Sequence, residues 1–129
     1  MGSLHLDVHI AAPRDRVFVF FVPQRMPLWY LPEMKTCFEI SGGESDFRVG
    51  QKVKITGHLG EREVSLVAVV QRYDWLRALE WEFQDAYGVR GRQMWEVEEG
   101  LGEPGKGSVP VPISTRVVMH EWYTFPGRL

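Results

Sequence analysis

Much of this 129-residue sequence is a run of short segments in which apolar and polar residues alternate. Alternation with a period of two is typical of strands that bury one face of a sheet. After residue 34, tight turns such as Gly60-Glu61 and Ala86-Tyr87-Gly88 join several of these segments. Strands joined by tight turns pair antiparallel, so the sequence predicts an antiparallel meander rather than a parallel sheet. The segments are residues 35–41, 51–59, 62–74, 76–85, 89–99 and 113–125.

A further alternating segment, residues 4–10, precedes a short helical stretch. Pro13 suits the first turn of a helix, and Asp15 lies near the positive end of the helix dipole. We therefore expect a half-buried strand followed by a helix from about Pro13 to Phe21. The strand would carry Leu4, Leu6, Val8 and Ile10 on its apolar face, and His5, Asp7 and His9 on its polar face.

Residues 21–34, here called the lid segment, place three prolines around the aromatic pair Trp29-Tyr30. Proline lacks an amide hydrogen and disfavours helical geometry in the residue before it. A single straight helix is therefore excluded, and a kinked connection of two short helices is expected. We interpret so much apolar surface on a bent segment as a lid over a ligand cavity.

Composition limits what such a cavity could belong to. A chain of this length is expected to form one domain, residues 1–129. The formal net charge of the chain, −2, creates no positive electrostatic field that would attract nucleic acid. Cys37 is the single cysteine, which excludes an intrachain disulfide and a cysteine-based zinc cluster and fits a cytoplasmic location. No apolar run is long enough for integral membrane association, and no signal peptide is recognised.

Charged side chains on the strands are expected to form a solvated ladder. Glu80 and Glu82 would face Arg90 and Arg92 on the next strand. Another group, Glu96 and Glu98, would face Arg116.

Three local patterns in the sequence do not form functional sites. The residues His5, Asp7 and His9 share a strand face without a third element to complete a metal site, so no metal is predicted. Cys37 is expected to be a buried or half-buried structural residue. The loop 100–112 resembles the start of a phosphate-binding pattern, but it lacks the required hydroxyl and the helix that must follow.

Several stretches of the sequence together resemble the START-like (SRPBCC, Bet v 1-like) superfamily, in particular its polyketide cyclase/dehydrase-like branch. These stretches are AAPRDRVFVFF, MPLWYLP, GQKVKITG, LEWEFQDAYGVRGRQMWEVE and RVVMHEWYTFPGRL. The resemblance implies an α+β helix-grip fold, in which a curved antiparallel sheet of about seven strands wraps around a long C-terminal helix. It also implies that apolar molecules such as lipids, sterols or polyketides bind between sheet and helices, and that the lid segment covers them.

The sequence departs from this family at its C-terminus. It stops at PGRL, where Pro126-Gly127 would lead into the long helix. Either the sequence is truncated before that helix, or the concave face of the sheet lacks its cover. In the second case exposed apolar side chains would favour a homo-oligomer.

The cavity is expected to be lined mainly by large apolar side chains. Gln93 should share a face with Trp95, where it would orient a polar ligand atom or bond to a neighbouring side chain or an ordered water. On the last strand, Val117, Met119, Glu121 and Tyr123 would point inward if Arg116 faces solvent, whereas the opposite register would place Val118, His120 and Trp122 inside. The predicted ligand-binding residues are Trp29, Tyr30, Trp81, Phe83, Gln93, Trp95, Met119 and Tyr123.

Three functions remain open from the sequence. The first is binding or transport of a hydrophobic small molecule without a cofactor. The second is a polyketide cyclase or dehydratase, which would close or dehydrate its substrate by general acid/base chemistry. The third is a co-chaperone-like module that binds proteins. Weak catalytic candidates, none at a diagnostic spacing, are Tyr30, Tyr87, Gln93, His120, Glu121 and Tyr123.

Overall fold

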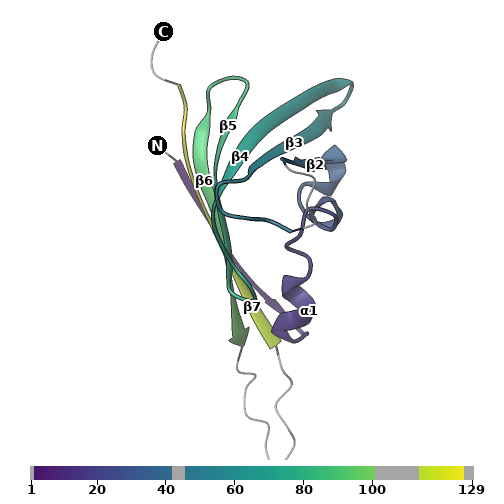
Figure 1. Ribbon diagram of the computed structural model, residues 1–129, viewed down its shortest axis with the longest axis vertical. Helices are drawn as coiled ribbons and strands as arrows, with labels where there is room; N and C mark the ends of the chain where they lie inside the picture. Colours follow the sequence, from purple (N-terminus) through teal and green to yellow (C-terminus); the bar gives the residue numbers. More distant parts are fainter. Residues whose placement is uncertain (1, 42–45, 101–113, 127–129) are drawn as a thin grey trace, which may run out of the picture.

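The computed structural model describes residues 2–41, 46–100 and 114–126. Its centre is a curved antiparallel sheet with the strand order β1-β7-β6-β5-β4-β3-β2 (Figure 1). The predicted antiparallel meander is therefore confirmed. The strands are β1 (Gly2–Ile10), β2 (Cys37–Ile40), β3 (Lys52–Leu59), β4 (Arg62–Asp74), β5 (Ala78–Asp85), β6 (Arg90–Gly100) and β7 (Ser114–Thr124).

The first and last strands lie side by side at one edge of the sheet. Their register places His5 opposite His120 and Leu4 opposite Glu121. From β7 to β2, each strand pairs antiparallel with the strand that precedes it in the sequence. These pairs are hairpins. The β5–β6 turn is closed by Asp85, whose Oδ1 accepts hydrogen bonds from the backbone nitrogens of Tyr87 and Val89. Gly88 takes φ +86 in this turn, the left-handed conformation that a glycine adopts without strain.

The helices lie on one side of the sheet (Figure 1). They are α1 (Arg14–Phe18) and two 3-10 helices, η1 (Met26–Leu28) and η2 (Pro32–Met34). Pro27 and Pro32 occupy first-turn positions of η1 and η2, where a missing amide hydrogen costs nothing. The lid segment therefore bends as expected. None of these short helices has the length and hydropathy that a bilayer-spanning helix needs, as far as the described residues extend.

The first helix is shorter than the sequence predicted. It ends at Phe18 rather than Phe21, because the chain tightens into hydrogen bonds between residues three apart, such as Phe21 N to Phe18 O at 2.9 Å. This tightening packs Phe18 and Phe21 against each other, with ring centroids 5.3 Å apart. Both rings are buried and join the core.

The core lies between the sheet and the lid segment. Trp81 and Leu79 on β5 and Val53 on β3 are fully buried in one cluster with Phe18 and Met26. Aromatic rings dominate it, and Trp81 meets Trp95 edge to face with 5.1 Å between ring centroids. The buried sheet residues of this core thus come from β3 to β6.

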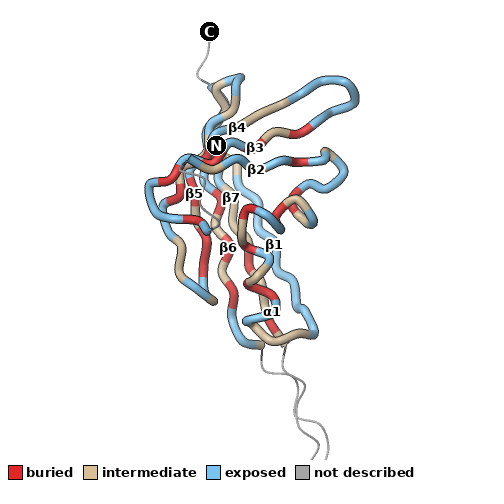
Figure 2. The backbone as a smooth tube through the Cα atoms, turned by 45° about the vertical axis from the view of Figure 1, so that its right-hand side comes forward, coloured by how far each residue is buried: buried red, intermediate tan, exposed pale blue. Residues whose placement is uncertain are grey.

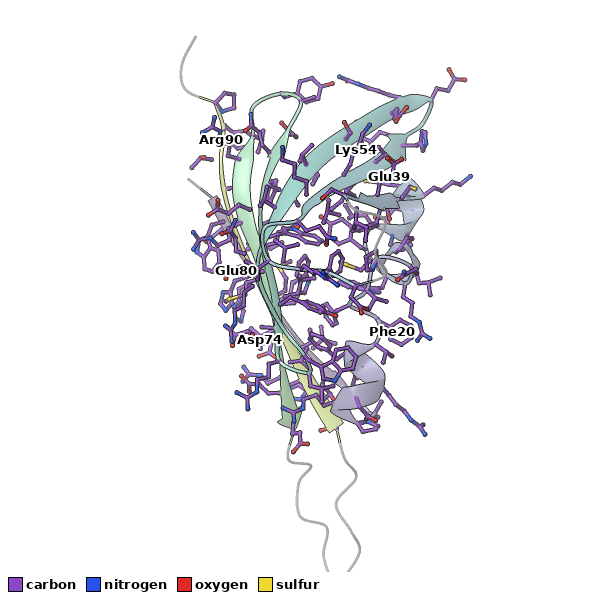
Figure 3. All side chains as sticks on the ribbon, viewed as in Figure 1. Phe20, Glu39, Lys54, Asp74, Glu80 and Arg90 are labelled. Carbon is purple, nitrogen blue, oxygen red and sulfur yellow. The ribbon has the colours of Figure 1, made fainter. Side chains whose placement is uncertain are left out.

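Charged side chains occupy the outer face of the sheet, where Figure 3 shows Glu80 pointing away from the helices. Arg92 lies 3.5 Å from Glu80 and 3.2 Å from Glu82, as expected. The pairing of Arg116 with Glu98, at 3.6 Å, was also expected, whereas its bidentate hydrogen bonds to Asp7 were not. Arg116 thus ties β6, β7 and β1 together.

Two expectations need correction, and two fall outside the described residues. Cys37 is exposed rather than buried, because β2 is an edge strand whose alternation turns Phe38 toward the core instead. The apolar face of β1 is open rather than half-buried, since Leu4, Leu6, Val8 and Ile10 are all exposed. Gly127 of the expected Pro126-Gly127 lead-in and most of the loop 100–112 lie outside the described residues.

Candidate functional site

An apolar groove runs along the concave face of the sheet beside the lid segment. Its volume is about 790 Å³. Strands β1, β6 and β7 form its floor. Its wall is formed by α1, the lid segment and Phe20 between them, which Figure 3 labels. The lining residues are Leu4, Leu6, Val8, Ile10, Ala12, Arg16, Val17, Phe20, Phe21, Trp29, Tyr30, Leu31, Gln93, Trp95, Val117, Met119 and Glu121.

Strand β1 supplies the open side of this groove. Leu4, Leu6, Val8 and Ile10 are between 37% and 50% exposed, and Figure 2 shows the strand exposed over nearly its whole length. The sequence predicted correctly that these four residues share a face. It could not predict their exposure, because alternation identifies a shared face and not what covers it. Within the described residues, no helix lies over this edge of the sheet.

The lid segment is held by hydrogen bonds to backbone oxygens. Trp29 Nε1 donates to the Phe20 carbonyl at 2.8 Å, and Thr36 Oγ1 donates to the Tyr30 carbonyl at 2.8 Å. The Trp29 ring also meets Trp95 on β6, with 5.9 Å between centroids. These contacts fix Trp29 and Tyr30 at the wall of the groove.

Gln93 on β6 joins three side chains from other elements. Tyr30 Oη and Trp81 Nε1 both donate to Gln93 Oε1, at 3.1 Å and 2.8 Å. Its Nε2 donates to Glu121 Oε1 at 2.6 Å. An indole nitrogen only donates, so the amide oxygen must face Trp81 and the amide nitrogen must face Glu121. Of the alternatives open from the sequence, the structure thus favours bonds from Gln93 to neighbouring side chains.

Tyr30 is a neutral hydrogen-bond donor in this arrangement. Burial raises the pKa of Tyr30 to about 12, the hydrogen bond to Gln93 opposes that rise, and the charge of Glu121 adds to it. Since the phenol already donates to Gln93, it has no free proton for a ligand in the described geometry. Glu121 is therefore the acidic group of the network that reaches the groove.

The structure brings together five of the predicted ligand-binding residues. The others lie elsewhere: Trp81 is fully buried in the core, beneath Gln93. Phe83 packs its ring over Gly91, and Tyr123 packs its ring over Gly2, toward the far end of β5 to β7. The predicted residues that line the groove are Trp29, Tyr30, Gln93, Trp95 and Met119.

The catalytic candidates are divided between the two faces of the sheet. Gln93 and Glu121 line the groove with Tyr30. Tyr87 is 59% exposed on the β5–β6 turn, where Arg62 stacks over its ring at 5.1 Å. His120 lies on the outer face, where its Nδ1 is 3.2 Å from that of His5. The register with Arg116 toward solvent is therefore the one that the structure adopts.

Sequence reasoning missed several groove residues. Arg16, Phe20 and Leu31 line the groove but were not predicted to bind a ligand. For Phe20 and Leu31 a signal existed, because Phe20 directly precedes the aromatic lid segment that suggested a cavity and Leu31 lies within it. Arg16 is an exposed residue on a short helix and carried no such signal.

Neither of two other features of the outer face makes a better site. A larger and shallower hollow of about 1190 Å³ lies over β4 to β7 and includes the predicted residues Phe83 and Tyr123. Its lining mixes apolar side chains with charged ones such as Glu82, Arg90 and Arg92, so it is less apolar than the groove. His9 lies 3.8 Å from Asp7, yet no group of three metal-binding side chains forms in the described part of the chain. The apolar groove remains the candidate site.

Comparison with known proteins identifies the fold but not the function. No family model and no curated protein matches the sequence. Many solved structures are similar, including the following three. Mll3558 from Rhizobium loti has a TM-score of 0.68 at 20% identity, over 99% of this chain and 82% of its own. Ara h 8.0201 has a TM-score of 0.65 at 11% identity, and the match covers 99% of this chain and 80% of that protein. Major latex-like protein 151 from Panax ginseng has a TM-score of 0.59 at 14% identity, and the match covers 98% of this chain and 80% of that protein.

At these identities the similarity concerns the fold alone. The sheet of seven antiparallel strands, with short helices after the first strand, occurs in Bet v 1-like proteins. The superfamily resemblance drawn from the sequence is thereby confirmed at this level. The chain has the helix-grip fold of the START-like, or Bet v 1-like, superfamily, and the described residues include the sheet and lid of that fold but no long C-terminal helix.

Proposed function

We propose that this protein binds or carries a hydrophobic small molecule in the apolar groove. The observation that supports this most directly is the lining, which is apolar except for Arg16, Tyr30, Gln93 and Glu121. Sites for small molecules are typically concave, roughly 300–1,000 Å³ in volume, and apolar with a few placed polar groups. The groove fits this description in volume and in chemistry.

The exposed side of the groove gives binding its driving force. Each large apolar side chain of β1 that a ligand covers would contribute on the order of 1 kcal/mol, because about half of its surface is still in contact with water. The Bet v 1-like fold of the similar structures is a further support, since it suggests a hydrophobic ligand-binding protein. A ligand would complete the burial that the sheet and lid segment leave unfinished.

The proposal is tested by binding of the neutral apolar dye N-phenyl-1-naphthylamine. Wild-type protein should increase the dye's fluorescence, and Val8→Lys should weaken binding by about tenfold, because a charge then lies on the groove floor. His9→Lys is the matched control, since His9 follows Val8 on the same strand but faces away from the groove. Equal binding by the two variants would place the dye elsewhere and contradict the proposal.

The ligand itself can be identified from protein purified without added compounds. Native mass spectrometry should show a fraction of molecules with extra mass, and solvent extraction should release an apolar compound of that mass. The same preparation of Val8→Lys should carry less of it than His9→Lys does.

A second candidate function, a cyclase or dehydratase, is supported by the position of Glu121. A carboxylate in an apolar groove is the kind of group that acts as a general base. If the protein is an enzyme, wild type should convert the extracted compound or its precursor over time, and Glu121→Gln should not. Binding without any mass change in the extracted compound would favour the carrier.

A further inference from the structure

A row of side chains crosses the concave face from the core to the open edge of the sheet. The strand registers place Trp81 opposite Gln93, Gln93 opposite Glu121, and Glu121 opposite Leu4. Hydrogen bonds connect the first three members of this row. Glu121 is therefore the last polar member before the apolar side chains of β1.

The direction of these hydrogen bonds fixes what Glu121 offers to a ligand. Because Trp81 only donates, Gln93 must turn its amide nitrogen to Glu121, and that bond holds the carboxylate as an acceptor. The bond engages Oε1, and a carboxylate has acceptor positions on both oxygens. The remaining positions of Glu121 are available at the groove.

Among the described residues, the positively charged side chains near the groove leave the carboxylate of Glu121 unpaired. No Lys, Arg or His in the described part of the chain forms an ion pair with Glu121. The basic residue of the groove, Arg16, follows the C-terminal end of β1. That end of β1 pairs with Thr115, whereas Glu121 pairs with Leu4 near the N-terminal end. Thr115 and Glu121 are six residues apart on β7, about 20 Å in an extended strand.

We propose that Glu121 selects apolar ligands whose polar end donates a hydrogen bond, namely a protonated amine or a hydroxyl. A carboxylate or phosphate placed there would meet a like charge in a partly desolvated groove, whereas a donor would gain a charge-assisted bond. The inference rests on the proposed function, because it assigns the head group of the molecule that the groove binds. Glu121 is thus a specificity residue, whether or not the protein is also an enzyme.

The test compares three ligands that share one chain and differ in the head group: n-decylamine, n-decanol and n-decanoate. Each is titrated against protein loaded with N-phenyl-1-naphthylamine near neutral pH, where the amine is protonated and the acid ionised. Wild type should release the dye at lower concentrations of amine and alcohol than of decanoate. The order of amine and alcohol then tells which donor the site prefers.

The decisive variant is Glu121→Gln, which keeps the size of the side chain and an acceptor for Gln93. The preference for decylamine over decanoate should fall by about tenfold, the loss expected for a hydrogen bond to a charged group. Decanol should change least, because an amide oxygen still accepts from a hydroxyl. Glu63→Gln is the control, since it removes the same charge from an exposed position on β4 outside the groove.

The outcomes separate the two proposals. If Glu121→Gln binds the dye and keeps the wild-type preference for decylamine over decanoate, Glu121 does not select the ligand. The proposal that the groove carries an apolar molecule would still stand. A wild-type preference for decanoate would lead to the same conclusion. Failure of wild type to bind the dye or any of the three decyl compounds would overturn both. A melting temperature measured for each variant shows that the comparison is made between folded proteins.

Discussion

At the scale of single residues, Gln93 illustrates how far sequence reasoning reaches. Strand alternation predicted that it shares a face with Trp95, and the cost of an unsatisfied buried amide predicted that it must have partners. The identity of those partners depends on the register of β7 and on the position of the lid segment, which are tertiary features. The partners Tyr30 and Glu121 come from those two elements.

The same network predicts how Tyr30 titrates. Burial raises its pKa from the ordinary value of 10.0 to about 12, so the native protein favours the neutral phenol. The stability that this provides is complete below pH 10, the unfolded pKa, and is lost as the pH rises through the folded pKa of about 12. The free energy of unfolding of wild type should therefore decline across that window.

The measurement is the absorbance of phenolate during an alkaline titration. Tyr30→Phe should remove part of the late-titrating signal, and so should Tyr73→Phe, because burial also raises the pKa of Tyr73 to about 12. The double variant should lose more of the late signal than either single variant. If Tyr30→Phe left the late step unchanged, the phenol would be more exposed than the structure describes.

At the scale of secondary-structure elements, strands were predicted better than the lid segment. The expected strand 62–74 has the bounds of β4, because a long run of apolar and β-branched residues after the Gly60-Glu61 turn favours an extended chain. The bulge between Val70 and Arg72, which shifts the register of β4 with β5, was not predicted. The lid segment was predicted to bend at its prolines. Its geometry also depends on the left-handed residues Leu31 and Lys35, on either side of η2, and neither residue type signals that conformation.

Lys35 therefore offers a test of the lid segment. Its φ of 51° and ψ of 55° are left-handed, which costs a residue with a Cβ roughly 1–2 kcal/mol and glycine almost nothing. Its side chain is exposed, so little contact is lost on substitution. Lys35→Gly should raise the free energy of unfolding by about 1 kcal/mol in urea denaturation, after part of the gain is offset by the greater freedom of glycine in the unfolded chain.

Lys35→Ala is the control for this experiment, because it removes the long side chain but keeps the Cβ. It should be no more stable than wild type. Equal stabilisation by the glycine and alanine variants would show that the lysine side chain, and not the backbone conformation, carries the cost.

At the scale of the whole molecule, the fold could be predicted from the strand pattern and the family resemblance. The exposure of the apolar face of β1 could not. The sequence predicts a buried apolar face on β1. The four residues of that face are instead exposed together along one edge of the sheet, namely Leu4, Leu6, Val8 and Ile10. An exposed apolar patch of this kind commonly marks a binding surface or favours association of copies. A ligand and a second copy of the chain would then compete for the same surface.

This competition can be measured through the state of association. Wild type should self-associate as its concentration rises in sedimentation equilibrium, and N-phenyl-1-naphthylamine should shift it toward the monomer by occupying the apolar groove. Leu6→Lys should remain closer to the monomer, because Leu6 is 48% exposed on that face. Leu59→Lys makes the same change at a residue that is 58% exposed and outside the groove, so it should associate as wild type does. Equal association of the two variants would mean that copies meet through another surface, and the open face would then be left to the ligand alone.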